Sequence, residues 1–84
     1  MTEAQTRIKA FLSRFIRQHD LQPDEDIFAL GFVNSLLAMQ LVNFVEKEFG
    51  VTIEDEDLDL ANFRTLAAID GMVERKRVAQ VAPR

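Results

Sequence analysis

Ser35 is the residue whose type and position best suit chemistry on a side chain of this protein. It lies where a long connection ends and an apolar-periodic run, Leu36 to Phe49, begins. A hydroxyl at such a junction commonly caps a helix by accepting a hydrogen bond from a free backbone N–H group. The position also suits a covalently attached phosphate, because a helix N-terminus carries partial positive charge. The residues around Ser35 leave both interpretations open.

The other reactive residue types do not form a catalytic constellation in the sequence. There is no cysteine, His19 is the only histidine, and no glycine-rich phosphate loop is present. We interpret His19 as a solvated residue at a helix end, where an imidazole complements the dipole. The alternate acids of the run 55–59 have calcium-loop spacing, but Leu60 stands where an EF-hand needs glycine and Leu66 where it needs glutamate. We therefore expect neither intrinsic catalysis nor a metal site.

Charge is unevenly distributed along the 84 residues. The stretch from Asp20 to Leu60 holds eleven acids and one base, Lys47, for a charge of −10; because the net charge is −4, the two ends together carry +6. A negative centre argues against nucleic-acid binding there and favours partners with basic surfaces. The chain has no apolar run of about 18–20 residues and no secretory apolar region near Met1. We expect a monomeric, cytoplasmic protein without a membrane segment.

The first helix is predicted to start near Glu3, because Thr2 and Gln5 have the spacing of a capping box. It should fade near His19, since the residue before Pro23 is pushed out of the helical region. One apolar face is made by Ala4, Ile8, Phe11, Leu12, Phe15 and Ile16.

A connection of about fifteen residues, 20–34, follows; loops of this length in a compact domain are usually functional or disordered. This one is not disordered in composition, and Pro23-Asp24 and Gly31 supply turn chemistry. Its apolar residues can hold it against a core: Ile27, Phe28, Leu30, Phe32 and Val33. We expect an ordered loop that places Ser35 at the surface.

The second helix is predicted from Leu36 to Phe49, with Gly50 as its C-cap. A helical wheel gives a core stripe of Ala38, Leu41, Val42, Val45 and Phe49, with Met39 beside it. The opposite side carries Leu36, Leu37, Gln40, Asn43, Phe44 and Lys47. Three of these, Leu36, Leu37 and Phe44, are large and apolar, which indicates an interaction site on the outward side. Alternatively, the side chains of Leu36 and Leu37 are buried under the loop.

Two further helices complete the prediction. A brief third helix is expected within Glu54–Leu60, with Leu58 and Leu60 turned inward. Thr65 can cap a fourth helix, and residues 79–84 should fray. The apolar stripe of the fourth helix is Leu66, Ile69, Met72 and Val73. The sequence thus predicts an all-α four-helix bundle with a long first loop and a short third helix, forming one domain over residues 1–84.

These residues resemble those of the acyl carrier protein family over nearly the whole chain. The similarity is carried by Gly31-Phe32-Val33-Asn34-Ser35-Leu36, Leu41-Val42, Glu46-Lys47-Glu48-Phe49-Gly50-Val51-Thr52-Ile53 and Phe63-Arg64-Thr65-Leu66. It implies an acyl-carrier-like bundle in which a transferase attaches 4′-phosphopantetheine from coenzyme A to Ser35. The thiol of that arm would carry an acyl group as a thioester, which a chain without cysteine can offer only through an added group.

The resemblance also implies which residues meet cargo and partner enzymes. Core positions 38, 41, 42, 45 and 49 would face the cargo, with Ile53, Phe63 and Ile69 as neighbours. The family's acidic recognition helix carries over to Glu46 and Glu48. With the outward side of the second helix, the predicted partner-binding residues are Asn34, Leu36, Leu37, Gln40, Phe44, Glu46, Lys47 and Glu48. The partners would be a phosphopantetheinyl transferase and acyl-loading, tailoring and acyltransferase enzymes.

The chain departs from the usual family pattern around Ser35. Asn34 stands where aspartate is usual, Leu37 and Gln40 replace acids, and Lys47 interrupts the later acidic pair. This pattern is similar to that of freestanding carriers of bacterial secondary metabolism, such as those loaded with a hydroxymalonyl or methoxymalonyl extender unit for polyketide or hybrid peptide–polyketide assembly. Two alternatives stay open. One is a peptidyl or D-alanyl carrier, and the other is an unmodified helical adapter that docks through Leu36, Leu37 and Phe44.

Overall fold

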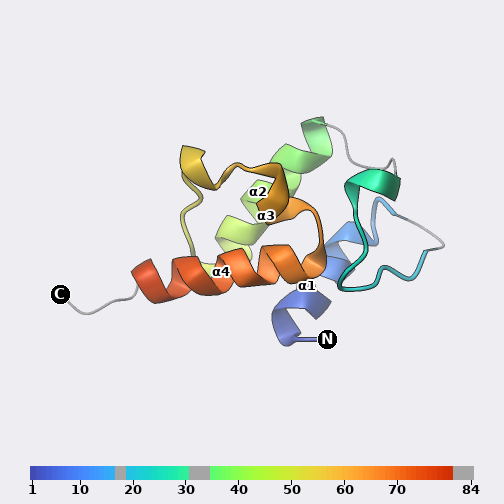
Figure 1. Cartoon of the computed structure of the whole chain (residues 1–84), viewed down its shortest axis with the longest axis horizontal. Coiled ribbons are helices and arrows are strands. Elements are labelled where there is room, and N and C mark those ends of the chain that lie inside the picture. Colours follow the sequence, from blue (N-terminus) through green and yellow to red (C-terminus); the bar gives the residue numbers. More distant parts are fainter. Residues whose placement is uncertain (17–18, 31–34, 81–84) are drawn as a thin grey trace.

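The computed structural model describes residues 1–16, 19–30 and 35–80, and for Ser35 it describes the backbone alone (Figure 1). The regular secondary structure of the described residues is helical. The α-helices are α1 (Glu3–Leu12), α2 (Ser35–Phe49), α3 (Leu60–Phe63) and α4 (Leu66–Gln80); η1 (Phe28–Leu30) and η2 (Asp55–Asp57) are short 3₁₀ turns. The predicted all-α fold of four helices, with a long first loop and a short third helix, is confirmed.

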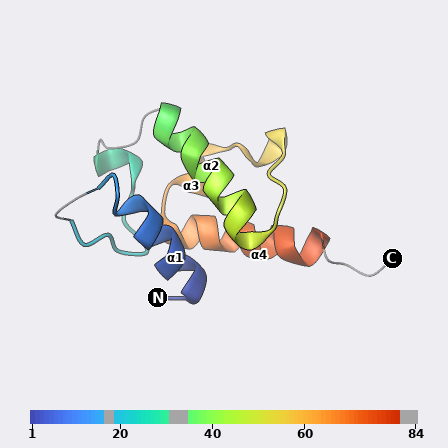
Figure 2. The ribbon, with the colours of Figure 1, turned by 180° about the vertical axis from the view of Figure 1, so that it is seen from behind.

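The core lies where α1, α2 and α4 meet. In Figure 1, α4 runs horizontally with part of α1 below it, and Figure 2 shows α1 and α2 in front of α4 from the opposite side. Each helix contributes one row of buried side chains: Ile8 and Leu12 from α1, Leu37, Leu41 and Val45 from α2, and Leu66, Ile69, Met72 and Val73 from α4. Burial of these rows supplies the main stabilisation, because no cysteine is available for a disulfide.

The start of α1 agrees with the prediction and its end does not. The backbone N–H of Gln5 donates to the Thr2 hydroxyl at 3.1 Å, and the Thr2 N–H donates to the Gln5 side chain at 3.4 Å, which completes the capping box. The helix ends at Leu12, well before His19, so the predicted end was wrong. The hydroxyl of Ser13 donates to the Ala10 carbonyl at 2.7 Å, and i→i+3 backbone bonds tighten the turn that follows.

The first loop is tied to the helices by backbone hydrogen bonds. The N–H of Ile27 donates to the Arg64 carbonyl at 2.8 Å, and the N–H of Ala67 donates to the Pro23 carbonyl at 2.9 Å. Ile27 is fully buried, and Phe28 and Leu30 pack against the core as predicted. Phe32 and Val33, which were predicted to do the same, lie outside the described residues.

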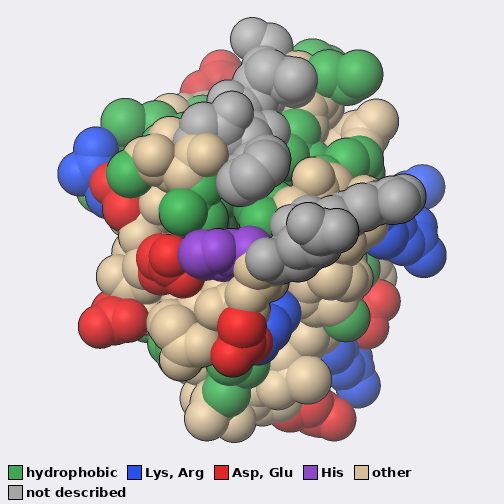
Figure 3. All heavy atoms as spheres, turned by 90° about the vertical axis from the view of Figure 1, so that its right-hand side faces the viewer, with side chains coloured by type: hydrophobic (Ala, Val, Ile, Leu, Met, Phe, Trp, Pro, Cys, Tyr) green, Lys and Arg blue, Asp and Glu red, His purple; other side chains and the backbone are tan. Residues whose placement is uncertain are grey.

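Polar contacts also fasten this loop. Lys9 pairs with Asp20, and its hydrogen bond and charge hold the pKa of Asp20 below its usual range. His19 contacts the Glu25 carboxylate at 2.7 Å, and Figure 3 shows the single histidine against an acidic side chain. The pKa of Glu25 is lowered, mainly by a hydrogen bond from the backbone N–H of Gln22. Because α1 ends before it, His19 acts within the loop and does not complement a helix dipole.

The buried row of α2 is turned toward α1 relative to the prediction. Leu37 is only 4% exposed, whereas the predicted core residues Ala38, Val42 and Phe49 are half-buried. The reason is that α1 and α4 both pack against α2 and together cover the side of the helix that carries Leu37, Leu41 and Val45. The placement of Leu37 on the outward side was therefore wrong. Gly50 ends the helix with a φ of 66°, as its role of C-cap requires.

The segment after α2 forms two short turns instead of one helix over Glu54–Leu60. The carboxylate of Asp57 accepts from the Glu54 N–H at 2.9 Å, and the carboxylate of Asp59 accepts from the Ala61 N–H at 3.1 Å. These acids cap η2 and α3 separately and so break a continuous helix. Leu58 and Leu60, predicted to turn inward, are exposed, and that prediction was wrong.

The α4 helix is longer than predicted at its end. Thr65 caps its start by accepting from the Ala68 N–H at 3.0 Å, and all four residues of the predicted stripe are buried. Residues 79 and 80 are helical, because the Gln80 side chain bonds both the N–H and the carbonyl of Thr52 at 2.9 Å. The fraying of residues 79–84 stays a prediction, and residues 81–84 lie outside the described ranges. None of the described helices has the length and apolar character needed to cross a membrane.

Candidate functional site

Ser35 is the first residue of α2, one position earlier than the predicted helix start. The helix it opens has fifteen residues, and its first turn carries no acid. A phosphate attached there would meet free N–H groups and the positive end of the helix dipole without a repelling carboxylate in that turn. The side chain of Ser35 and the whole of Asn34 lie outside the described residues, so their roles stay predictions.

An apolar cavity of about 200 Å³ lies between the first half of α2 and α3. Its walls are Ile27, Phe28, Ala38, Leu41, Val42, Leu58, Asp59, Leu60 and Phe63. Four residues that the resemblance assigned to the cargo belong to this lining: Ala38, Leu41, Val42 and Phe63. The other four lie elsewhere: Val45 and Ile69 are fully buried in the core, and Phe49 and Ile53 pack against it.

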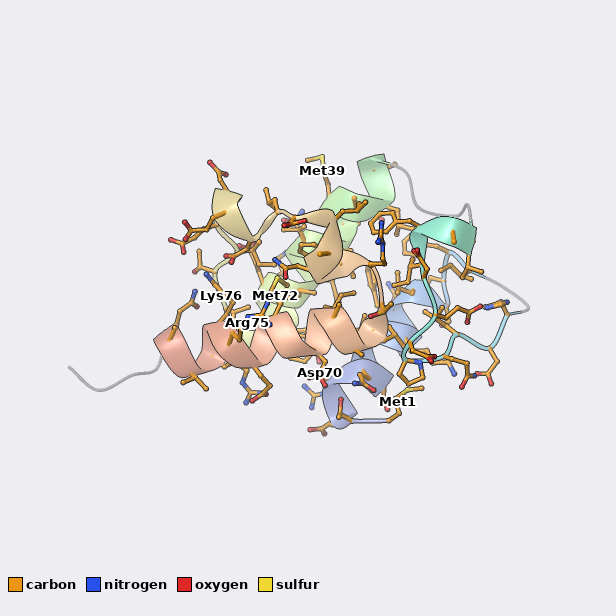
Figure 4. All side chains as sticks on the ribbon, in the orientation of Figure 1. Met1, Met39, Asp70, Met72, Arg75 and Lys76 are labelled. Carbon is orange, nitrogen blue, oxygen red and sulfur yellow. The ribbon has the colours of Figure 1, made fainter. Side chains whose placement is uncertain are left out.

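Exposed apolar side chains continue from this cavity onto α2: Leu58 and Leu60 line the cavity, Met39 lines the hollow beside it, and Leu36 lies about one helical turn before Met39. The apolar face, as we name it, consists of Leu36, Met39, Leu58 and Leu60, which are 66%, 65%, 56% and 52% exposed. Met39 points away from the body of the protein in Figure 4, and Leu58 borders both the cavity and a shallow hollow beside Met39. Exposed apolar residues gathered in this way mark a surface that meets another molecule.

Ion pairs hold the outer wall of the cavity to α4. The ammonium of Lys76 lies 2.7 Å from Asp57 and 3.1 Å from Glu54, and Arg75 donates to the Asn62 side chain at 3.1 Å (Figure 4). The hydrogen bond from Lys76 lowers the pKa of Asp57, and the same contact raises the pKa of Lys76. The sequence analysis missed this link, although the acidic run 54–57 and the basic run 75–77 were its signal.

The predicted partner-binding residues do not form one surface. Leu36 belongs to the apolar face, whereas Leu37 is buried. Glu46 is half-buried and accepts from the N–H of Ile53 at 2.9 Å, so its carboxylate supports the loop that follows α2. The remaining four line a groove between α1 and α2: Gln40, Phe44, Lys47 and Glu48. A docking patch that combines Leu36, Leu37 and Phe44 is thereby excluded as a single surface.

Within the described residues, no group of three histidine, aspartate or glutamate side chains is placed to hold a metal ion. The acids of the run 55–59 instead have the structural roles given above, since Asp57 pairs with Lys76 and Asp59 caps α3.

Comparison with known proteins adds the family. A family model described as a phosphopantetheine attachment site matches residues 6–69, which is well over half of the chain. Among curated proteins, none matches significantly. The matched range includes Ser35, all of α2 and α3, and every residue that lines the cavity. The chain therefore belongs to the phosphopantetheine attachment family and is a carrier protein that binds 4′-phosphopantetheine covalently.

Proposed function

We propose that Ser35 is the attachment residue and that the protein carries an acyl group as a thioester for polyketide or hybrid peptide–polyketide synthesis. The observation that carries this proposal is the position of Ser35 at the start of the helix whose first half walls the apolar cavity. The N–H groups of the first turn of α2 would bind the phosphate of the arm. The arm supplies the thiol that the chain itself lacks.

The cavity would receive the apolar part of the cargo. Leu41 and Phe63 are buried, and Ala38 and Val42 are half-buried, so these four residues form a partly shielded apolar wall, whereas Leu58 and Leu60 are exposed. Its volume of about 200 Å³ is smaller than the ~300–1,000 Å³ typical of sites for drug-sized ligands. The size favours a short acyl group over a long chain. An extender unit such as hydroxymalonyl or methoxymalonyl, which the sequence resemblance suggests, has a suitable length, but its carboxylate would stay in solvent because the lining is mainly apolar.

Partner enzymes would approach over the apolar face. An acidic carrier surface would attract basic partners, but Leu36, Met39, Leu58 and Leu60 carry no charge. We infer that the enzymes of this pathway meet the carrier through an apolar surface near Ser35, and that they supply the catalytic groups.

The attachment site is tested by incubating the purified chain with coenzyme A and a broad-specificity phosphopantetheinyl transferase. Intact mass spectrometry should show the gain of one phosphopantetheine group. Ser35→Ala should abolish the gain. Ser13→Ala is the matched control, since Ser13 is the only other serine, and it should be modified like the wild type. A gain that survives in Ser35→Ala, or is lost in Ser13→Ala, would contradict the assignment.

The cargo is tested with the modified protein. Acyltransferases for malonyl-type units and adenylating enzymes for amino acids are offered in parallel, and the acylated mass is recorded. We expect loading by an acyltransferase of the first kind. Exclusive loading by an adenylating enzyme would make the protein a peptidyl or D-alanyl carrier instead.

A further inference from the structure

The groove between α1 and α2 is a second hollow on the surface, separate from the cavity against α3. It has a volume of about 570 Å³ and is open to solvent along its length. Figure 2 shows the two helices that form it, and residues of both contribute to its lining. On α2 it begins at Gln40 and ends at Glu48, so it lies beyond the first turn that starts at Ser35.

Aromatic rings form the floor of this groove. The rings of Phe11 and Phe44 stack at a centroid distance of 4.5 Å and an angle of 16°, which joins α1 to α2. Phe15 continues the row at 5.4 Å from Phe11 and is 40% exposed. Part of this aromatic surface therefore remains available to an apolar side chain from outside, and aromatic contacts of this kind contribute beyond the area they bury.

Two cations at the rim have no partner within the described part of the chain. Arg7, Lys9, Arg64, Lys76 and Arg77 each pair with a carboxylate, and Arg75 bonds the Asn62 side chain. Among the described lysines and arginines, this leaves Arg14 and Lys47, and both line the groove. The protein has a net charge of −4, yet the two cations that are unpaired among the described residues lie beside the exposed aromatic floor of the groove.

We propose that this groove binds an acidic segment of a partner protein, which places one aromatic or large aliphatic side chain on Phe11, Phe15 and Phe44. Carboxylates of that segment pair with Arg14 and Lys47. The groove accommodates a turn or two of a helix laid between α1 and α2, which is a known mode of peptide recognition. It would hold the carrier on one protein while the Ser35 end of α2 serves another.

A foreign segment fits better than a second copy of this chain. Two copies would each bring a net charge of −4 and repel one another. Two acids of a second copy's acidic run are also engaged, since Asp57 and Glu54 already pair with Lys76. The groove alone is smaller than a standard interface, so the contact should be weak and depend on salt.

The test uses the full-length ¹⁵N-labelled chain and a capped helical peptide of about twelve residues, long enough for marginal helicity. One face of the peptide carries two phenylalanines spaced i, i+4, and its flanks carry glutamates. We expect saturable shifts in the amide signals of residues 7–15 and 40–48. We also expect Arg14→Glu/Lys47→Glu to weaken binding by about tenfold or more.

Three controls separate the alternatives. Arg64→Glu/Arg77→Glu makes the same change in net charge at exposed positions outside the groove and should bind like the wild type. A peptide with lysines in place of glutamates should not bind. The unmodified chain is used throughout, so the result does not depend on whether Ser35 accepts the arm.

Several outcomes would overturn the proposal. They are no binding up to millimolar peptide, equal binding of the lysine peptide, equal loss in the two charge-reversal variants, or shifts centred on Leu36, Met39 and Leu58. Peptide-independent dimers that depend on Arg14 and Lys47 would assign the groove to a second copy. Sedimentation with phosphatidylglycerol-containing vesicles, without peptide binding, would assign it to a membrane surface.

Discussion

The two sides of α2, one facing α3 and the other facing α1, border hollows of different size and chemistry. Toward α3, a small apolar cavity is closed by short turns and surrounded by exposed leucines and a methionine. Toward α1, a larger open groove has stacked phenylalanines as its floor and unpaired cations at its rim. The cavity suits a small apolar group that must be kept from water. The groove suits an acidic segment that binds weakly and reversibly.

The difference shows how one fifteen-residue helix can serve two tasks. Its buried row, Leu37, Leu41 and Val45, faces the core and separates the two flanks. Because side chains on a helix point outward around the axis, residues one position apart in sequence can belong to different surfaces. Met39 and Gln40 are such a pair: the first lies on the apolar face and the second lines the groove.

The largest change in stability is expected when a residue of the buried row of α2 is truncated. Leu41→Ala should lower the free energy of unfolding by about 2–5 kcal/mol, because it leaves a void next to a buried core. Leu36→Ala, at an exposed position of the same helix, should change it by less than about 0.5 kcal/mol. Urea denaturation followed by circular dichroism measures both. Equal losses would mean that Leu36 is covered in solution and that the apolar face is not free.

An intermediate effect is expected from filling the cavity. Ala38→Leu adds apolar volume to a wall of the cavity and should raise the free energy of unfolding by about 1 kcal/mol. Gln40→Leu is the control on the other flank and should stay within about 0.5 kcal/mol. The same denaturation measurement applies. If Ala38→Leu destabilises the protein, the cavity has no room for the three added carbon atoms, and this would count against an acyl cargo there.

The smallest effect concerns the ion pairs that hold the cavity wall. The pKa of Asp57 lies below its ordinary value of 3.8, so its contribution to stability is present above that pH and is lost as the pH falls through the lowered pKa. The pKa of Lys76 lies above 10.5, so its contribution is lost only as the pH rises through that raised pKa. The pair thus stabilises the fold across the neutral range.

Asp57→Asn should lower the thermal midpoint at neutral pH by a few degrees and speed amide hydrogen exchange in residues 54–63. The difference in thermal midpoint between Asp57→Asn and the wild type should disappear in strong acid, where Asp57 is protonated in both the folded and the unfolded state. Asp55→Asn makes the same charge change at an exposed side chain and should have almost no effect. A midpoint difference that persists unchanged in strong acid would show that packing, and not the ion pair, holds the wall.

Local chemistry predicted the ends of elements where the deciding residues lie close in sequence. The Thr2–Gln5 box, the Thr65 cap and the Gly50 C-cap each depend on groups within about three positions, and all three are confirmed. The same logic failed for the third helix. There the acids compete for nearby N–H groups, and sequence alone did not show that Asp57 and Asp59 would cap separate turns.

The buried side of α2 and the position of the cavity depend on long-range packing, which the sequence pattern alone does not reveal. Periodicity identified α2 as amphipathic, but the arc that is buried depends on where α1 and α4 lie, and so Leu37 was misplaced. The cavity is likewise a product of the loop, α2 and α3 meeting, and its link to α4 joins residues about twenty apart. Ser35 as an attachment residue came from the resemblance and the helix start, and it stays a prediction until the modification is measured.

The clasp between Gln80 and Thr52 matters for anyone who joins this carrier to an enzyme. It holds the end of α4 beside the linker that leaves the far end of α2, and α2 is about 20 Å long by its helical rise. An enzyme fused after α4 would therefore be attached near the end of α2 that lies opposite Ser35. The length and stiffness of the connecting peptide would then set how often the arm on Ser35 meets the active site of the fused enzyme.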